Sequence, residues 1–170
     1  MIKLNMRTRK PNRLKDFDYT KNHSYFVTIC AKDKHELFGG ISLGIMHLSP
    51  LGHIVEDALT SIPHIYSDVI LHNHVIMPNH IHFILRMCRG DYQSPETSST
   101  STTQATTQPT LSQIVRLFKR TVSVDAEFSP WQKSFHDHII RDESGFTKIS
   151  DYINNNVSTW DNDCFNPKRA

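Results

Sequence analysis

The stretch Val75-Ile76-Met77-Pro78-Asn79-His80-Ile81-His82-Phe83-Ile84-Leu85 says most about the fold of this chain. Pro78-Asn79 is typical of a tight turn, so we predict two strands, over 69–77 and 80–87, joined as a hairpin. Residues two apart in a strand share one face. His80 and His82 therefore point to one side of the predicted sheet, while Ile81 and Phe83 point into a core. Two imidazoles on a rigid strand form a platform for a divalent metal ion.

Strands and helices alternate on both sides of this hairpin. We predict further strands over 23–31, 41–48 and 133–141, and helices over 50–62, 111–124 and 146–160. The first helix has a clear start, because Ser49 can cap it and Pro50 suits its first position. Strands interleaved with helices predict a single α+β domain over 1–170, with an antiparallel sheet, helices packed on one face and a further C-terminal helix.

Two segments differ in composition from the rest of the chain. Residues 1–20 form a basic arm, in which six lysines and arginines precede the first acid, Asp16. Such an arm is compatible with a phosphate backbone, although solvated tails often have the same composition. Residues 93–110 are rich in Ser, Thr and Gln and nearly free of apolar side chains. We expect a flexible insertion there, because the segment cannot bury enough surface to offset its ordering.

Bulk composition places the chain among soluble proteins. Hydrophobic residues make up 38% and charged residues 21%, and the formal net charge is +2. No apolar run is long enough to span a membrane, so no membrane partner is expected. The three cysteines have no paired spacing, which favours free thiols in a reducing cytoplasm over a disulfide framework or a cysteine zinc site.

Spacing alone does not decide which histidines bind a metal. The chain has eleven histidines, and His72 and His74 have the same spacing as His80 and His82. The string His72-Asn73-His74 matches the name of the His-Asn-His nucleases only as text, since the histidines of that motif lie much further apart. Two imidazoles and one weaker oxygen ligand leave open positions, which suits Mg²⁺ or Mn²⁺ acting on a phosphate.

The predicted last helix carries a tyrosine and an asparagine at helical spacing. Tyr152 and Asn156 are four residues apart and share one face. The phenol is a possible nucleophile, and the amide oxygen is a possible metal ligand. The plainer interpretation is a half-buried tyrosine and an asparagine near a helix end.

Four stretches in this order resemble a known family: Tyr25-Phe26-Val27-Thr28-Ile29-Cys30 with Leu37-Phe38-Gly39; Met77-Pro78-Asn79-His80-Ile81-His82-Phe83; 131–141 from Trp131 to Arg141; and Tyr152-Ile153-Asn154-Asn155-Asn156 with Trp160 and Asp163. The family is that of the IS200-like, single-tyrosine transposases of the HUH class, and the branch is that of the REP-associated tyrosine transposases. Val157 departs from the family, whose members commonly have proline at this position.

The resemblance implies a ferredoxin-like sheet and a transposase that cleaves and rejoins single-stranded or hairpin DNA through a 5′-phosphotyrosine. It makes Tyr152 the nucleophile and His80, His82 and Asn156 the ligands of Mg²⁺ or Mn²⁺. It further implies a bacterial cytoplasmic protein, at the nucleoid when bound to DNA, and a possible homodimer. An HUH-class replication initiator and a non-catalytic hairpin-binding relative stay open as alternatives.

Other side chains are candidates for contacts with DNA. Arg116, Lys119 and Arg120 lie on the polar side of the predicted helix 111–124, where they can follow a phosphate backbone or simply face solvent. Trp131, Phe135 and Trp160 can stack on bases or belong to the core.

Overall fold

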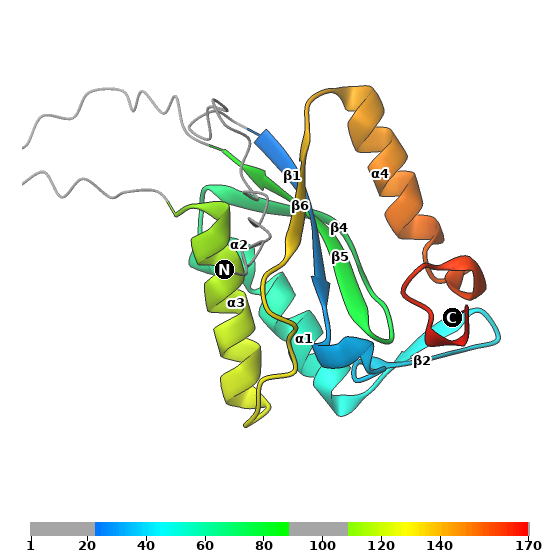
Figure 1. Ribbon diagram of the computed structural model, residues 1–170. Helices are drawn as coiled ribbons and strands as arrows, with labels where there is room; N and C mark the ends of the chain where they lie inside the picture. The colour runs from blue at the N-terminus through cyan, green and yellow to red at the C-terminus, as the bar shows by residue number, and fades with distance from the viewer. Residues whose placement is uncertain (1–22, 89–108, 170) are drawn as a thin grey trace, which may run out of the picture.

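Strand β1 (His23–Cys30) lies inside the sheet and pairs on both of its edges. The computed structural model describes residues 23–88 and 109–169. β1 is antiparallel to β5 (His80–Met87) on one side and to β6 (His136–Ile140) on the other. β4 (Val69–Ile76) is antiparallel to the other edge of β5, which gives a four-stranded sheet of order β4-β5-β1-β6 (Figure 1).

The connections between these strands make the fold ferredoxin-like, as predicted. β1 reaches β4 through helix α1 (Pro50–Thr60) and the short α2 (Ile62–Ile65), and β5 reaches β6 through α3 (Leu111–Asp125). The strands of the two β-α-β units interleave, because β5 lies between β1 and β4 while β1 lies between β5 and β6. The predicted α+β class and antiparallel sheet are confirmed.

The two faces of the sheet are covered by different helices. Val27, Phe83 and their alternating neighbours pack with the apolar sides of α1 and α3 in the main core. Ile84 and Ile140, on the opposite face, pack against Ile153 of α4 (Glu143–Asn155). Figure 1 shows α3 and α4 on opposite sides of the sheet. As expected, α1 and α3 pack on one face of the sheet, and α4 is a separate helix on the other face.

One predicted strand is a hairpin instead. Residues 41–48 were expected to form one strand, but the chain forms β2 (Gly39–Ser42) and β3 (Ile45–Leu48), which pair with each other outside the main sheet. Leu43 and Gly44 turn the chain with φ of 52° and 72°. Two successive residues of positive φ make the tight turn that joins antiparallel strands.

Other bounds differ by a few residues. β6 is shorter than the predicted strand 133–141, and Ser134, inside that range, has a φ of 69°. The last helix was predicted over 146–160; α4 begins three residues earlier and ends at Asn155, and Trp160 begins a separate turn, η2 (Trp160–Asn162).

Two predicted segments fall outside this description. The basic arm, residues 1–20, lies outside the described residues, as does the 93–110 insertion except for Pro109 and Thr110. Thr110 caps α3 through its hydroxyl, and Gln113 returns a bond to its backbone N–H. Within the described parts of the chain, no helix is long and apolar enough to span a bilayer.

Candidate active site

The alternation of β5 places both histidines on the α4 side of the sheet. Ile81 and Phe83 point into the main core, so His80 and His82 point the other way. The two residues are 0% and 2% exposed, and their ring centroids lie 4.5 Å apart. The structure therefore places the two predicted histidines side by side in a buried position.

Asn79 fixes the orientation of His80. The Asn79 amide nitrogen donates to the carbonyls of Lys34 and Phe165, at 3.1 Å and 2.7 Å. The amide oxygen therefore faces His80 and accepts from its Nδ1, at 2.9 Å. An amide oxygen cannot donate, so Nδ1 carries the hydrogen and Nε2 keeps its lone pair. This is the tautomer in which an imidazole binds a metal through Nε2.

Thr28 holds His82 in a similar way. Thr28 lies directly opposite His82 in the β1–β5 register, and its hydroxyl is 2.8 Å from His82 Nδ1. Phe26, two residues earlier on β1, stacks on the His82 ring with centroids 5.1 Å apart. The imidazole is thus held at one nitrogen and along one face, and Nε2 is left to point toward α4.

Burial keeps both rings uncharged. It lowers the pKa of His80 to about 2, with smaller contributions from His82 and Lys34, and lowers the pKa of His82 to about 4. Near neutral pH both imidazoles are neutral, which is the form that binds metal ions. Asp163 Oδ2 lies 3.9 Å from His80 Nε2. Because the imidazole is neutral, this contact is not an ion pair near neutral pH.

Helix α4 carries the tyrosine to this surface. Its N-terminus is capped by Asp142, whose carboxylate accepts from the Gly145 backbone N–H at 2.7 Å. Ile153 is buried against the sheet, and its neighbour Tyr152 is turned toward the histidines. The Tyr152 hydroxyl lies 3.3 Å from His82 Nε2. The nucleophile proposed from the sequence and one proposed metal ligand are therefore in direct contact.

The environment of Tyr152 keeps its phenol protonated. Burial raises the pKa of Tyr152, and the Asn156 side chain opposes that shift, while the charge of Asp163 adds to it. The side chain is still 44% exposed, so solvent reaches the ring. A phenol in this position needs help to lose its proton before it can attack an electrophile.

Asn156 supplies unsatisfied polar atoms near the tyrosine. It follows α4 directly and is 1% exposed, yet neither its amide oxygen nor its amide nitrogen has a hydrogen-bond partner among the described residues. His80 Nε2 is likewise without a hydrogen bond there. Buried polar atoms are rarely left unpaired, so two acceptors here, the Asn156 amide oxygen and His80 Nε2, fit a bound cation.

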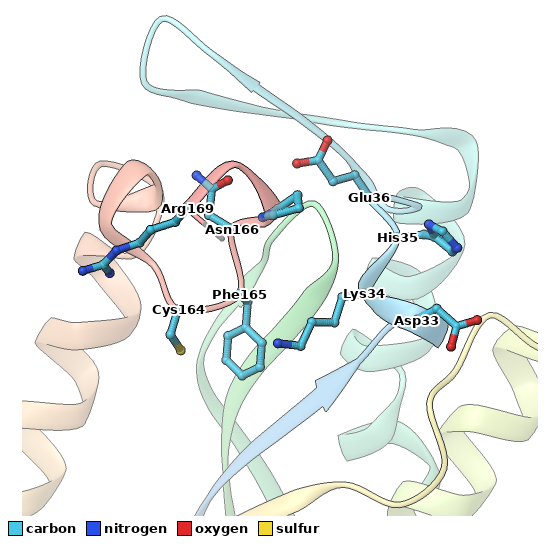
Figure 2. A pocket seen from close by; sticks show the side chains of 9 residues that line it. Asp33, Lys34, His35, Glu36, Cys164, Phe165, Asn166 and Arg169 are labelled. Atoms are coloured by element: carbon cyan, nitrogen blue, oxygen red, sulfur yellow. The ribbon is translucent and has the colours of Figure 1, made fainter.

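The C-terminal segment completes the site, at two residues for which the sequence predicted no contact with the histidines. Phe165 lies against His80 with ring centroids 4.5 Å apart, and Asp163 faces the same imidazole. Figure 2 shows Phe165 and Lys34 pointing toward each other. Both line a cavity of about 810 Å³ between the Lys34 loop and this segment. In the sequence, the match of Trp160 and Asp163 to the family pattern was the feature that could have indicated that this segment belongs to the site.

The rival histidine pair is separated by the structure. A register shift between Leu71 and His74 interrupts the alternation of β4. His74 pairs with Phe83 and lies on the main-core side of the sheet, whereas His72 packs against Phe146 of α4. His72 and His74 therefore do not face a common ion.

The basic residues of α3 lie away from the histidines. α3 covers the opposite face of the sheet (Figure 1). Arg116 and Arg120 are exposed on this helix. The Lys119 ammonium donates to the carbonyls of Gln132 and Ser134, at 2.7 Å and 2.9 Å, and so holds the loop before β6. A role for these three residues in DNA binding stays a prediction. Of the aromatic candidates, Trp131 and Trp160 are buried and Phe135 is partly buried.

Comparison with known proteins gives one close relative. No protein-family model matches the chain. An uncharacterized protein of Haemophilus influenzae is 37% identical over 164 residues, and the match covers 91% of this chain and 91% of that protein. The chain belongs to the same family as this Haemophilus protein.

Solved structures identify the fold. A REP-associated tyrosine transposase bound to a REP hairpin superposes with a TM-score of 0.59 at 17% identity, over 87% of this chain and 74% of that one. A proposed transposase from Deinococcus radiodurans is a weaker match, with a TM-score of 0.48 at 15% identity, over 84% of this chain and 95% of that one. The first of these matches shows that the fold of this family member is that of the REP-associated tyrosine transposase.

Proposed function

We propose that this protein is a metal-dependent transposase that cleaves and rejoins single-stranded DNA through a 5′-phosphotyrosine on Tyr152. The observation that carries the proposal is the 3.3 Å approach of the Tyr152 hydroxyl to His82 Nε2, because it places a nucleophile beside a pair of neutral, buried imidazoles. The fold likeness to a transposase bound to a REP hairpin supports hairpin DNA as the class of substrate.

His80, His82 and Asn156 would hold the ion, as their oriented or unpaired polar atoms suggest. When bound, Mg²⁺ or Mn²⁺ would supply Lewis acidity toward the scissile phosphate.

The chain's own residues account for the remaining steps. Phe26 and Thr28 fix the imidazole against which Tyr152 lies, so the phenol oxygen is held at a defined position. As this oxygen bonds to phosphorus, its proton passes to water, which reaches the half-exposed side chain. The bond from phosphorus to the 3′ oxygen breaks, and that oxygen takes up a proton. A different 3′-hydroxyl then attacks the phosphotyrosine, releases the phenol and rejoins the strand.

Detection of the covalent intermediate tests the proposal. The protein is incubated with a labelled DNA hairpin carrying single-stranded flanks, with Mn²⁺ or Mg²⁺, and denaturing electrophoresis separates the adduct. We expect Tyr152→Phe to abolish the adduct and Tyr66→Phe, a partly buried tyrosine outside the site, to retain it. His80→Ala should lower the yield more than the roughly 10- to 100-fold typical of losing an outer-shell partner. Hairpin binding without an adduct under either metal would contradict the proposal and favour a non-catalytic binding protein.

A further inference from the structure

A carboxylate from the C-terminal segment, that of Asp163, faces the first imidazole of the histidine pair. The Asp163 side chain is 5% exposed, and its Oδ2 lies 3.9 Å from His80 Nε2. This separation is too long for a hydrogen bond. It is within the span of two ligands that share one ion, which reaches about 4.2 Å when each lies roughly 2.1 Å from a Mg²⁺-sized ion.

The position of Asp163 is fixed by its own segment. Its Oδ1 accepts from the Phe165 backbone N–H at 2.7 Å, and its N–H donates to the Trp160 carbonyl at 3.0 Å. Asn166, buried, donates its amide to the same Trp160 carbonyl. Phe165 is tied in turn to Asn79, the residue that orients His80. One network therefore positions both the imidazole and the carboxylate.

Charge gives a second reason to connect Asp163 with a cation. His80, His82 and Asn156 are neutral as ligands, so they leave the full charge of a divalent ion uncompensated in a buried site. A buried carboxylate is equally costly without a positive partner. His80 does not fill that role, because its ring hydrogen lies on Nδ1, which is bonded to Asn79, and Nε2 presents a lone pair to the carboxylate. An ion between Asp163 and the imidazoles satisfies both requirements.

We propose that Asp163 is a further ligand of the divalent ion, supplied by the C-terminal segment. The donor set becomes two histidines and one carboxylate, with Asn156 as an additional oxygen donor. Two histidines with one carboxylate suit divalent ions such as Mn²⁺ that bind nitrogen and oxygen together. The inference rests on the proposed function, because it assumes that His80 and His82 bind such an ion.

Mn²⁺ binding to the metal-free protein, without DNA, tests this inference. Isothermal titration calorimetry gives the affinity, and the electron paramagnetic resonance signal of free Mn²⁺ gives an independent count of bound ions. Asp163→Asn removes the charge but keeps an oxygen for the Phe165 N–H. We expect it to weaken Mn²⁺ binding by about 10-fold or more. Asp163→Glu, which restores a carboxylate, should recover part of the affinity.

Asp161→Asn is the matched control, because Asp161 lies two residues earlier, is exposed and carries the same charge. It should leave the Mn²⁺ affinity unchanged, and both variants should melt near the wild-type temperature. Unchanged affinity in Asp163→Asn, with affinity lost in His80→Ala, would overturn the role of Asp163 and leave the proposed function standing. A wild-type protein that binds no Mn²⁺ would overturn the inference, and the adduct assay would then decide the proposed function separately.

Discussion

At the scale of single residues, the site depends on how each imidazole is held at Nδ1. Asn79 lies in the turn before β5 and Thr28 lies on β1, and each contacts one Nδ1, so that the Nε2 atoms face Asp163 and Tyr152. The His80-Ile81-His82 spacing predicted only that the two rings share a face. It could not identify these partners, because Thr28 lies 54 positions away in the sequence and meets His82 only through the β1–β5 register.

Replacement of Thr28 tests that arrangement. Thr28→Val keeps the shape and the β-branch but removes the hydroxyl, so His82 Nδ1 becomes a buried polar atom without its partner. We expect a loss of about 1–3 kcal/mol in the free energy of unfolding. Mn²⁺ affinity should fall by about 10-fold or more, because the imidazole loses its orientation. Urea denaturation and calorimetric titration measure the two effects. Thr28→Ser, which retains the hydroxyl, should stay close to wild type in Mn²⁺ affinity, and equal affinities in all three proteins would contradict the argument.

At the scale of elements, the packing around α1 requires glycine at position 52, where helix propensity alone would favour alanine. Gly52 lies in the first turn of α1, where a Cβ would overlap the carbonyl oxygen of Phe38 and approach the Leu48 side chain. The Phe38 carbonyl cannot easily move away, because it accepts from the Ser49 N–H at 2.9 Å. The hairpin of β2 and β3 is thus fastened to the start of α1 at a position that admits only glycine.

Gly52→Ala should therefore destabilise the protein. In an open helix the change would add up to about 1 kcal/mol of stability, since alanine has the higher helix propensity. Here the forced contact should cost about 1–3 kcal/mol instead. Thermal and urea unfolding measure the difference. Gly40→Ala serves as the control, because a Cβ there has open space. A Gly52→Ala protein as stable as Gly40→Ala would contradict this account.

The same hairpin shows where sequence patterns stop being informative. Helices α1 and α3 were predicted from their apolar periodicity, and α1 also from its Ser49 cap, and this periodicity agrees with the faces that they bury. The hairpin was missed because its turn is Leu43-Gly44, and a leucine at positive φ is uncommon where Asn-Gly or Asp-Gly is the usual signal. The role of Asp163 was missed for a different reason, since its segment is irregular and periodicity has no meaning there.

At the scale of the whole molecule, the two faces of the sheet differ in what they contain. The α1 and α3 face holds the main core, and the other face holds the site. α4 packs mainly against β4 and β5, so the β6 side of that face keeps exposed residues, among them His136 and His138. These two histidines pair with Thr28 and Phe26 of β1 and so lie on the same face as His82. This part of the sheet is therefore where the DNA strand of the proposed function would reach Tyr152.

The same arrangement predicts that the tyrosine acts within its own chain. α4 follows β6 after only Arg141 and Asp142, and two residues span at most about 7 Å. Ile153 is also buried against Ile84 and Ile140 of the same chain, so moving the helix to a partner would expose it. Equal amounts of Tyr152→Phe and His80→Ala protein, mixed in the adduct assay, should therefore form no more adduct than either alone. Wild type mixed with Tyr152→Phe gives the reference signal. Adduct restored in the mixture of the two variants would mean that the helix of one chain completes the site of another.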